Sequence, residues 1–184
     1  YILSRFSDPA DRAKANNFWR DAIQKLHQES KEEDQQFFQA WLRSHYADTI
    51  RQGRAGSSNE DFEKIGTRFH SWFRDNLEKM GLTDSTDKFS TFVHGDMDFY
   101  VRAYLEIVKA RKEERSGWEQ VFYTSICGIA PSLAFPLMLA PLQPSDSPEQ
   151  IQKKMFWQCK NYWRQLQQRL ALFLEHLTLS KLFH

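Results

Sequence analysis

The residues best suited to chemistry are gathered in the segment "HGDMD". His94, Asp96 and Asp98 supply one imidazole and two carboxylates within five positions. Such groups are in principle enough to hold a divalent ion. An aspartate at the start of a helix also stabilises the helix N-terminus without any metal, because it offsets the partial positive charge there. We prefer the helix-start interpretation and keep the metal site as an alternative.

Two other places contain catalytic residue types. His70, Ser71 and Asp75 could be combined as base, nucleophile and orienting acid, but adjacent positions of a helix do not face each other. His45 falls on an apolar helical stripe, where we expect a core histidine and no catalytic role. The sequence has no glycine-rich phosphate loop, dinucleotide-binding fingerprint or nucleophile elbow. We therefore assign no catalytic, cofactor-binding or metal-binding residue.

Charged runs elsewhere predict solvated helix surfaces. The acidic run from Glu32 to Asp34 is typical of an exposed first turn. The basic residues between Lys109 and Arg115 alternate with glutamates, which is typical of a solvated helix. Cys127 and Cys159 cannot form a disulfide framework, and we expect both to be reduced thiols in the core.

The C-terminal segment is the strongest candidate for contact with nucleic acid. After Gln152, Glu175 is its only acidic residue, and the aromatic residues Trp157, Tyr162 and Trp163 lie between basic ones. Basic side chains can contact backbone phosphates while exposed rings stack on bases. The alternative is that helical spacing turns most of these rings into the core. The possible DNA-binding residues are Lys153, Lys154, Lys160, Arg164 and Arg169.

Composition indicates a globular helical body. The chain has 184 residues and a formal net charge of +1, so it has no global field to attract nucleic acid or an anionic membrane. Hydrophobic residues make up 41% and charged residues 27%, which argues against disorder. No proline occurs between Pro9 and Pro131, which favours long helices. The uncharged stretch 120–145 is interrupted by one glycine and several prolines, so we expect a buried, kinked helix there and no membrane span. The sequence has no basic stretch followed by an apolar run and a small-residue cleavage site, so we expect a cytoplasmic protein.

Apolar residues spaced by three and four predict the helices. The first should begin at Asp8 and Pro9, and the last should begin near Pro148, run through Leu177 and project as an arm. The fold expected is all-α, an irregular bundle of about six to eight helices with a long C-terminal helix, in one domain over residues 1–184. Other expected segments are a helix with a stripe from Phe37 to Ile50, a flexible connector near 51–60, a helix capped by Asn59 that runs from Phe62 to Met80, a short helix at 89–93, and a longer helix from Met97.

The order of several segments resembles the helical middle region of GmrSD-type restriction proteins. The match covers most of the chain and is carried by Phe18-Trp19, the stretch from Phe69 to Trp72, Asp98-Phe99-Tyr100, Val121-Phe122-Tyr123 and the run from Pro136 to Leu142. Proteins of that family join an N-terminal ParB-like domain, which binds and hydrolyses nucleotide, to a C-terminal HNH nuclease domain that cleaves modified phage DNA.

The resemblance implies a non-catalytic scaffold. The family's Asp-Gly-Gln-Gln-Arg motif and its histidine-rich nuclease motif have no counterpart here, so no catalytic residue is carried over. The chain is then expected to be an excised internal region that needs no cofactor of its own, with nucleotide and divalent metal bound by flanking domains. Its expected partners are those N-terminal and C-terminal domains and possibly DNA, with no membrane. Binding of DNA by the basic C-terminal helix is the alternative function.

Overall fold

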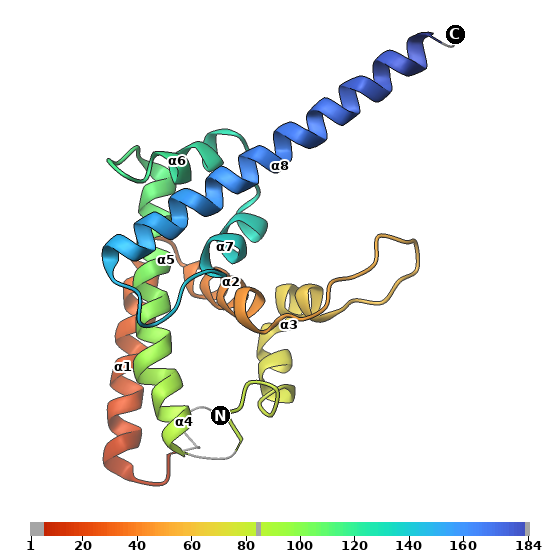
Figure 1. Ribbon diagram of the computed structural model, residues 1–184. Helices are drawn as coiled ribbons and strands as arrows, with labels where there is room; N and C mark the ends of the chain where they lie inside the picture. The colour runs from red at the N-terminus through yellow and green to blue at the C-terminus, as the bar shows by residue number, and fades with distance from the viewer. Residues whose placement is uncertain (1–5, 84–85, 183–184) are drawn as a thin grey trace.

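The fold is helical throughout the part of the chain that the computed structural model describes, residues 6–83 and 86–182, with side chains described in the last helix as far as Gln165 and at Gln168. No strand occurs in these residues, and the prediction of an all-α fold with a long C-terminal helix is confirmed (Figure 1). The helices are α1 (Pro9–His27), α2 (Glu33–Tyr46), α3 (Asp61–Asp75), α4 (Thr86–Thr91), the π-helical turn η2 (Phe92–Asp96), α5 (Met97–Lys112), α6 (Glu119–Ile126), α7 (Pro131–Leu139) and α8 (Pro148–Leu182).

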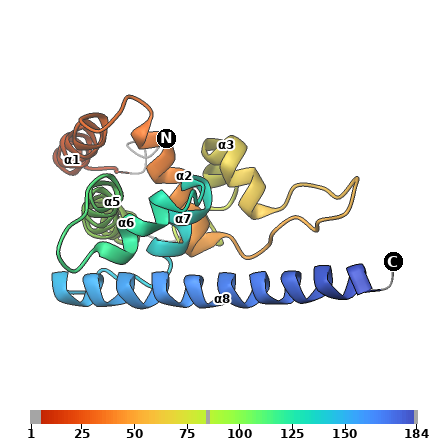
Figure 2. The ribbon, with the colours of Figure 1, turned by 90° about the horizontal axis from the view of Figure 1, so that it is seen from above.

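The helices form layers around α2. Figure 2 shows α1 and α5 side by side, α2 and α7 at the centre, and α8 lying along one side of the body. The C-terminal half of α8 extends beyond the other helices in both views (Figures 1 and 2). One side of α8 therefore packs on the body, and the other side is free of the described elements.

The observed helix ends correct two of the predicted ones. The first helix begins as expected, with Asp8 accepting a hydrogen bond from the backbone N–H of Asp11 at 3.1 Å. The second ends at Tyr46, so Ile50 lies outside it and is 64% exposed. The chain leaves the helix there because the carbonyl of Thr49 accepts the backbone N–H of Phe62, at the start of α3.

The third helix also differs from the prediction. Glu60, and not Asn59, is its N-cap, and a reciprocal capping box with Glu63 satisfies two backbone N–H groups. The helix ends at Asp75 and does not continue to Met80, although Met80 is buried as the apolar spacing predicted. Residues 51–60 form no helix and lie between α2 and α3 as an extended loop (Figure 1).

The segments from α4 to α5 form one helical rod. The predicted short helix and the predicted long helix are joined by the π-helical turn η2. A π turn holds more residues than an α turn, so it changes which positions face the core. Phe89, Phe92, Val93 and Met97 are all buried across this junction.

Aromatic rings around Trp41 form the centre of the core. The Trp41 side chain is fully buried and stacks on Phe92 at 4.8 Å, on Tyr100 at 5.4 Å and on Phe37 at 5.5 Å between ring centroids. These distances lie in the favourable range for aromatic pairs. The contacts join α2 to η2 and α5, so three elements depend on one indole.

One acidic residue is buried against the prediction. Glu33 belongs to the run expected to be a solvated first turn, yet it is only 7% exposed. Its carboxylate accepts a 2.6 Å hydrogen bond from the hydroxyl of Tyr104, and this partner makes the burial possible. Burial raises the pKa of Tyr104, and the bond to Glu33 raises that pKa further.

The uncharged stretch folds as α6 and α7, with Pro136 inside α7. Ala134, Phe135, Met138 and Leu139 of α7 are buried. In the described part of the chain, no helix combines the length and the apolar character that a membrane span requires.

We expect Trp41→Ala to lower the free energy of unfolding by about 3–5 kcal/mol, because it removes a large buried ring and leaves a cavity. Trp157→Ala, at a position 47% exposed, is the matched control and should change it by less than about 0.5 kcal/mol. Urea unfolding followed by circular dichroism measures both. Equal losses in the two variants would contradict a core centred on Trp41.

Candidate nucleic-acid interface

The candidate interface is a strip of basic and aromatic side chains on the outer face of α8. Positions 153, 157, 160 and 164 are separated by four, three and four residues, which places them on one side of a helix. Their side chains are exposed, as is that of Phe156 beside them. We call Lys153, Phe156, Trp157, Lys160 and Arg164 the α8 strip. The opposite face packs on the body through Met155 and Cys159, which are 1% and 2% exposed.

The two rings of the α8 strip are large and open to solvent. Trp157 is 47% exposed and Phe156 is 38% exposed, and the rings meet edge to face with centroids 5.5 Å apart. The ammonium of Lys160 lies 5.1 Å from the Trp157 centroid and 5.6 Å from the Phe156 centroid. Such a cation is attracted by the ring faces, and it stays available to a phosphate because its side chain is exposed.

The structure separates the five predicted basic residues. Lys153, Lys160 and Arg164 share the exposed face. Lys154 points elsewhere and forms an ion pair with Asp146, at 2.7 Å from each carboxylate oxygen. The side chain of Arg169 lies outside the described residues.

The aromatic residues of this segment also divide between the two alternatives. Trp157 belongs to the exposed strip, whereas Tyr162 and Trp163 are half-buried. Their rings contact each other with centroids 5.8 Å apart. Different faces of α8 therefore carry the exposed ring of Trp157 and the half-buried rings of Tyr162 and Trp163.

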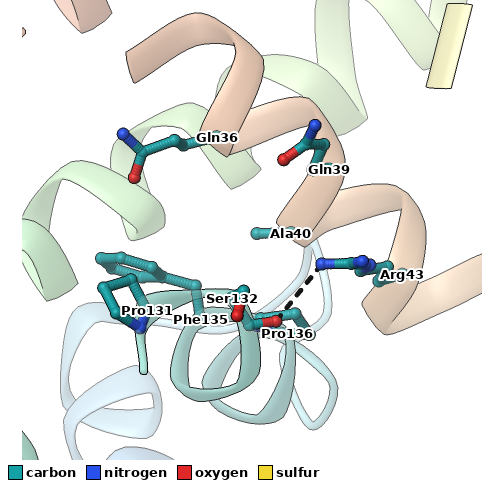
Figure 3. Close-up of a pocket in the computed structure, with 8 residues that line it drawn as sticks. All are labelled: Gln36, Gln39, Ala40, Arg43, Pro131, Ser132, Phe135 and Pro136. Carbon is teal, nitrogen blue, oxygen red and sulfur yellow. Dashed lines mark hydrogen bonds between the residues drawn. The ribbon is translucent and has the colours of Figure 1, made fainter. Parts of the chain in front are cut away.

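A groove lies between α2 and α7 (Figure 3). It has a volume of about 300 Å³. Two of its polar side chains join helices: Arg43 donates to the carbonyls of Phe62 and Ser132, at 2.8 and 3.4 Å, and Gln39 donates to the carbonyl of Gly66 at 2.9 Å. The lining residues are Gln36, Gln39, Ala40, Arg43, Pro131, Ser132, Phe135 and Pro136.

The residues of the metal alternative are engaged with other groups. His94 lies in η2 with its ring against Phe18, at 5.3 Å between centroids, and Asp98 pairs with Arg102 at 2.9 Å. Burial raises the pKa of Asp96. Among the side chains that the structure describes, no three His, Cys, Asp or Glu residues are grouped so that they could hold a metal ion.

The residues considered for a triad are also dispersed. The ring of His70 contacts Phe69, with centroids 3.7 Å apart, and Asp75 pairs with the neighbouring Arg74 at 3.3 Å. No hydrogen bond that the structure gives joins His70, Ser71 and Asp75.

His45 lies at the edge of the core, beside Tyr100 at 4.6 Å between ring centroids. Burial lowers the pKa of His45, and a hydrogen bond to the backbone of Leu139 partly opposes this effect. The Nε2 atom of His45 is buried and makes no hydrogen bond with any group that the structure describes. A proton added to this imidazole would therefore be poorly stabilised in the fold.

The two cysteines have different surroundings. Cys159 is a buried thiol, as predicted, and burial raises its pKa to about 11. Cys127 is exposed, so its prediction as a core thiol was wrong. The chain leaves α6 at this residue and turns at Gly128, which has a φ of 73°, so that the Cys127 side chain points to solvent.

Sequence reasoning missed the role of Arg111. Arg111 belongs to the basic run predicted to be a solvated helix, but its guanidinium donates to the hydroxyl of Thr124 at 2.7 Å and to the carbonyl of Ile129 at 3.1 Å. Desolvation lowers the pKa of Arg111. The spacing could have indicated this position. Arg111 lies seven residues after Tyr104, four after Ile107 and three after Val108, all of which are buried, so it belongs to the inward face of the helix.

The fold and the site together define an all-α helical body with a basic and aromatic face on its longest helix. No family model, curated protein or solved structure matches this chain.

We expect the fold to lose stability as the pH falls from 7 to 5, with part of the loss due to His45. Its folded-state pKa lies below the unfolded value, so the unfolded chain binds the proton more strongly. His45→Gln should show a smaller loss over this pH range than the unsubstituted protein. Denaturant unfolding at several pH values measures the difference. The exposed His70→Gln is the control, and an equal effect of both substitutions would contradict the assignment.

Proposed function

We propose that this chain is a non-catalytic helical scaffold of a GmrSD-like restriction protein in anti-phage defence. In this role it joins a nucleotide-hydrolysing domain to an HNH nuclease domain and holds their relative geometry. The flanking domains would bind the nucleotide and the divalent metal. The observation that carries the proposal is a continuous aromatic core that connects helices from both halves of the chain.

The segments that carry the family resemblance supply parts of this core. Phe69 and Trp72 of α3 are 9% and 4% exposed, and Phe99 and Tyr100 of α5 are 6% and 5% exposed. The run from Pro136 to Leu142 includes buried residues of α7 and the loop after it. The hydroxyl of Tyr100 donates to the carbonyl of Leu142 at 2.9 Å, which joins two of these segments. Three of the similar segments therefore contribute buried residues to the core, which supports a scaffold role.

The ring contacts run across the body. Trp19 stacks on Phe38 at 5.2 Å, and Phe38 stacks on Phe69 at 5.8 Å, which links α1, α2 and α3. Tyr104 contacts Phe135 at 4.7 Å, which links α5 and α7. Closely packed interiors rearrange between discrete states and do not deform gradually. This property suits an element that transmits a signal between two domains.

We expect Trp72→Ala, made in the intact protein that contains this chain, to weaken the coupling of DNA cleavage to nucleotide hydrolysis. Trp72 is buried and its Nε1–H donates to Asp61 at 3.0 Å, so its loss disturbs the packing of α3. The ratio of DNA cleaved to nucleotide hydrolysed measures the coupling, and thermal unfolding measures the packing. Tyr123→Ala, at a 42% exposed position, is the control. Unchanged coupling despite a lowered melting temperature would contradict the scaffold role.

A second function, contact with nucleic acid, is supported by the α8 strip. Lys153, Lys160 and Arg164 are exposed on one face, and the sequence has no acidic residue between Gln150 and Leu174. A local cluster of this kind attracts phosphates even though the net charge of the chain is only +1. The scaffold would then also help to position DNA for the nuclease.

We expect a variant with Lys153→Gln, Lys160→Gln and Arg164→Gln to bind DNA more weakly and with less salt dependence. Each phosphate contact contributes about 0.9 to the slope of log affinity against log salt for duplex DNA, so three lost contacts reduce the slope by about 2.7. Fluorescence anisotropy of a labelled oligonucleotide at several salt concentrations measures this slope.

The control for this test is the triple variant Lys14→Gln, Arg20→Gln and Lys25→Gln on α1. It makes the same change in net charge at exposed positions of another helix. In Figure 2, α1 and α8 lie on different sides of the body. If the two triple variants behave alike, the α8 strip is not the interface.

A further inference from the structure

The aromatic content of the α8 strip sets it apart from an ordinary basic surface. Trp157 and Phe156 hold exposed rings between Lys153 on one side and Arg164 on the other. Large exposed rings lose the free energy that their burial would provide, so a pair on one helix face indicates a partner that covers them. The partner must also accept three cations.

The charge of the strip favours nucleic acid over an apolar protein surface. Protein interfaces are depleted of lysine at their centre, because the ammonium is strongly hydrated. Here the Lys160 ammonium lies within 5.6 Å of both ring centroids, at the middle of the strip. A ligand that covers the rings must therefore bring negative charge to the same place. A base beside its own phosphate has both properties.

The rings further discriminate between paired and unpaired bases. In a duplex, the base faces are stacked on each other and only their edges reach the grooves. A tryptophan on the surface of a helix can stack on a base only when the base is unpaired. Phosphates alone are available to lysine and arginine in either case. The duplex would use the cations of the strip and leave its rings uncovered.

The dimensions of the strip fit a short segment of one strand. Lys153 and Arg164 are eleven residues apart, which is about 16 Å along a helix axis. The two rings lie between these ends in sequence and face the same side as the cations. Figure 2 shows that the body covers α8 from one side only, so a strand has open access along the other.

We propose that the α8 strip binds single-stranded DNA. Trp157 and Phe156 stack on unpaired bases, and Lys153, Lys160 and Arg164 pair with the phosphates beside them. This proposal rests on the proposed contact with nucleic acid and goes beyond it, since it names the unpaired strand as the ligand. It also assigns the specificity to the rings and the salt dependence to the cations.

The test compares oligo(dT) with a hairpin duplex that has the same number of phosphates. Oligo(dT) should bind at least about tenfold more tightly than the duplex. Trp157→Ala should weaken oligo(dT) binding by about 5- to 150-fold, the effect of losing one stacked base, and leave duplex binding unchanged. Trp157→Phe should retain most of the affinity for oligo(dT), because a ring that can stack remains.

The controls separate the rings from general effects. Tyr123→Ala removes an exposed ring on α6 and should leave both affinities unchanged. Lys160→Gln should weaken the binding of both ligands and reduce the salt dependence of both affinities, because its charge can pair with a phosphate of either ligand. Circular dichroism and thermal unfolding establish that each variant keeps the fold, as expected for substitutions at exposed positions.

The outcomes distinguish the two proposals. Equal affinity for duplex and oligo(dT), with no effect of Trp157→Ala, would overturn the single-strand proposal and leave the contact with DNA intact. No binding of either ligand at low salt would overturn both. The chain could instead self-associate through the rings. If Trp157→Ala abolished self-association without any effect on DNA binding, the rings would bind a second copy of the chain, and the single-strand proposal would be overturned.

Discussion

Trp41 stacks between rings of α2, η2 and α5 at the centre of the core. Trp41 contacts Phe37 within α2, Phe92 in η2 and Tyr100 in α5. Burial of these rings removes a large apolar area from water, and their edges and faces are arranged favourably. The core fixes α2 and α5, and these in turn hold α7 and, through α6 and α7, the inner half of α8. The α8 strip is presented to solvent because the opposite face of the helix is committed to this core.

Polar groups inside the body fix the arrangement of the helices. The hydrogen bond from Tyr104 to Glu33 joins residues 71 positions apart, and Arg111 reaches Thr124 and the Ile129 carbonyl. An unpaired carboxylate or guanidinium in the same place would cost free energy, so each pair selects one packing of the helices over others. A body of this kind has few alternative arrangements. The proposed scaffold role requires this property, and so does a helix face that presents rings and cations in a fixed order.

Much of the fold could be predicted from local patterns, and the candidate site could be predicted only in part. The cap at Asp8, the start of α8 at Pro148 and the buried spacing of Ile65, Phe69 and Trp72 follow from interactions within a few residues. The exposed position of Ile50 could not be predicted in this way, because α2 ends at Tyr46 and Thr49 bonds to the start of α3. The π turn η2 was also missed, since an inserted residue shifts the apolar spacing without leaving a separate signal. The basic residues of α8 were recognised in the sequence, but their division into exposed and paired groups was not.

Local patterns in the sequence are enough to predict that the chain is helical, where most helices lie, and that its C-terminal segment combines basic residues with aromatic rings. These properties depend on spacing, capping and composition, which are local. The folded arrangement sets which polar residues are buried and which cationic side chains are exposed. Lys154 pairs with Asp146 and so does not join the exposed basic residues of α8, and the hydroxyl of Tyr104 donates a hydrogen bond to Glu33 in the core. The first contact depends on the turn that leads into α8, and the second forms only when segments 71 residues apart pack together. In both, the free energy of a charged group is set by the groups that surround it in the fold.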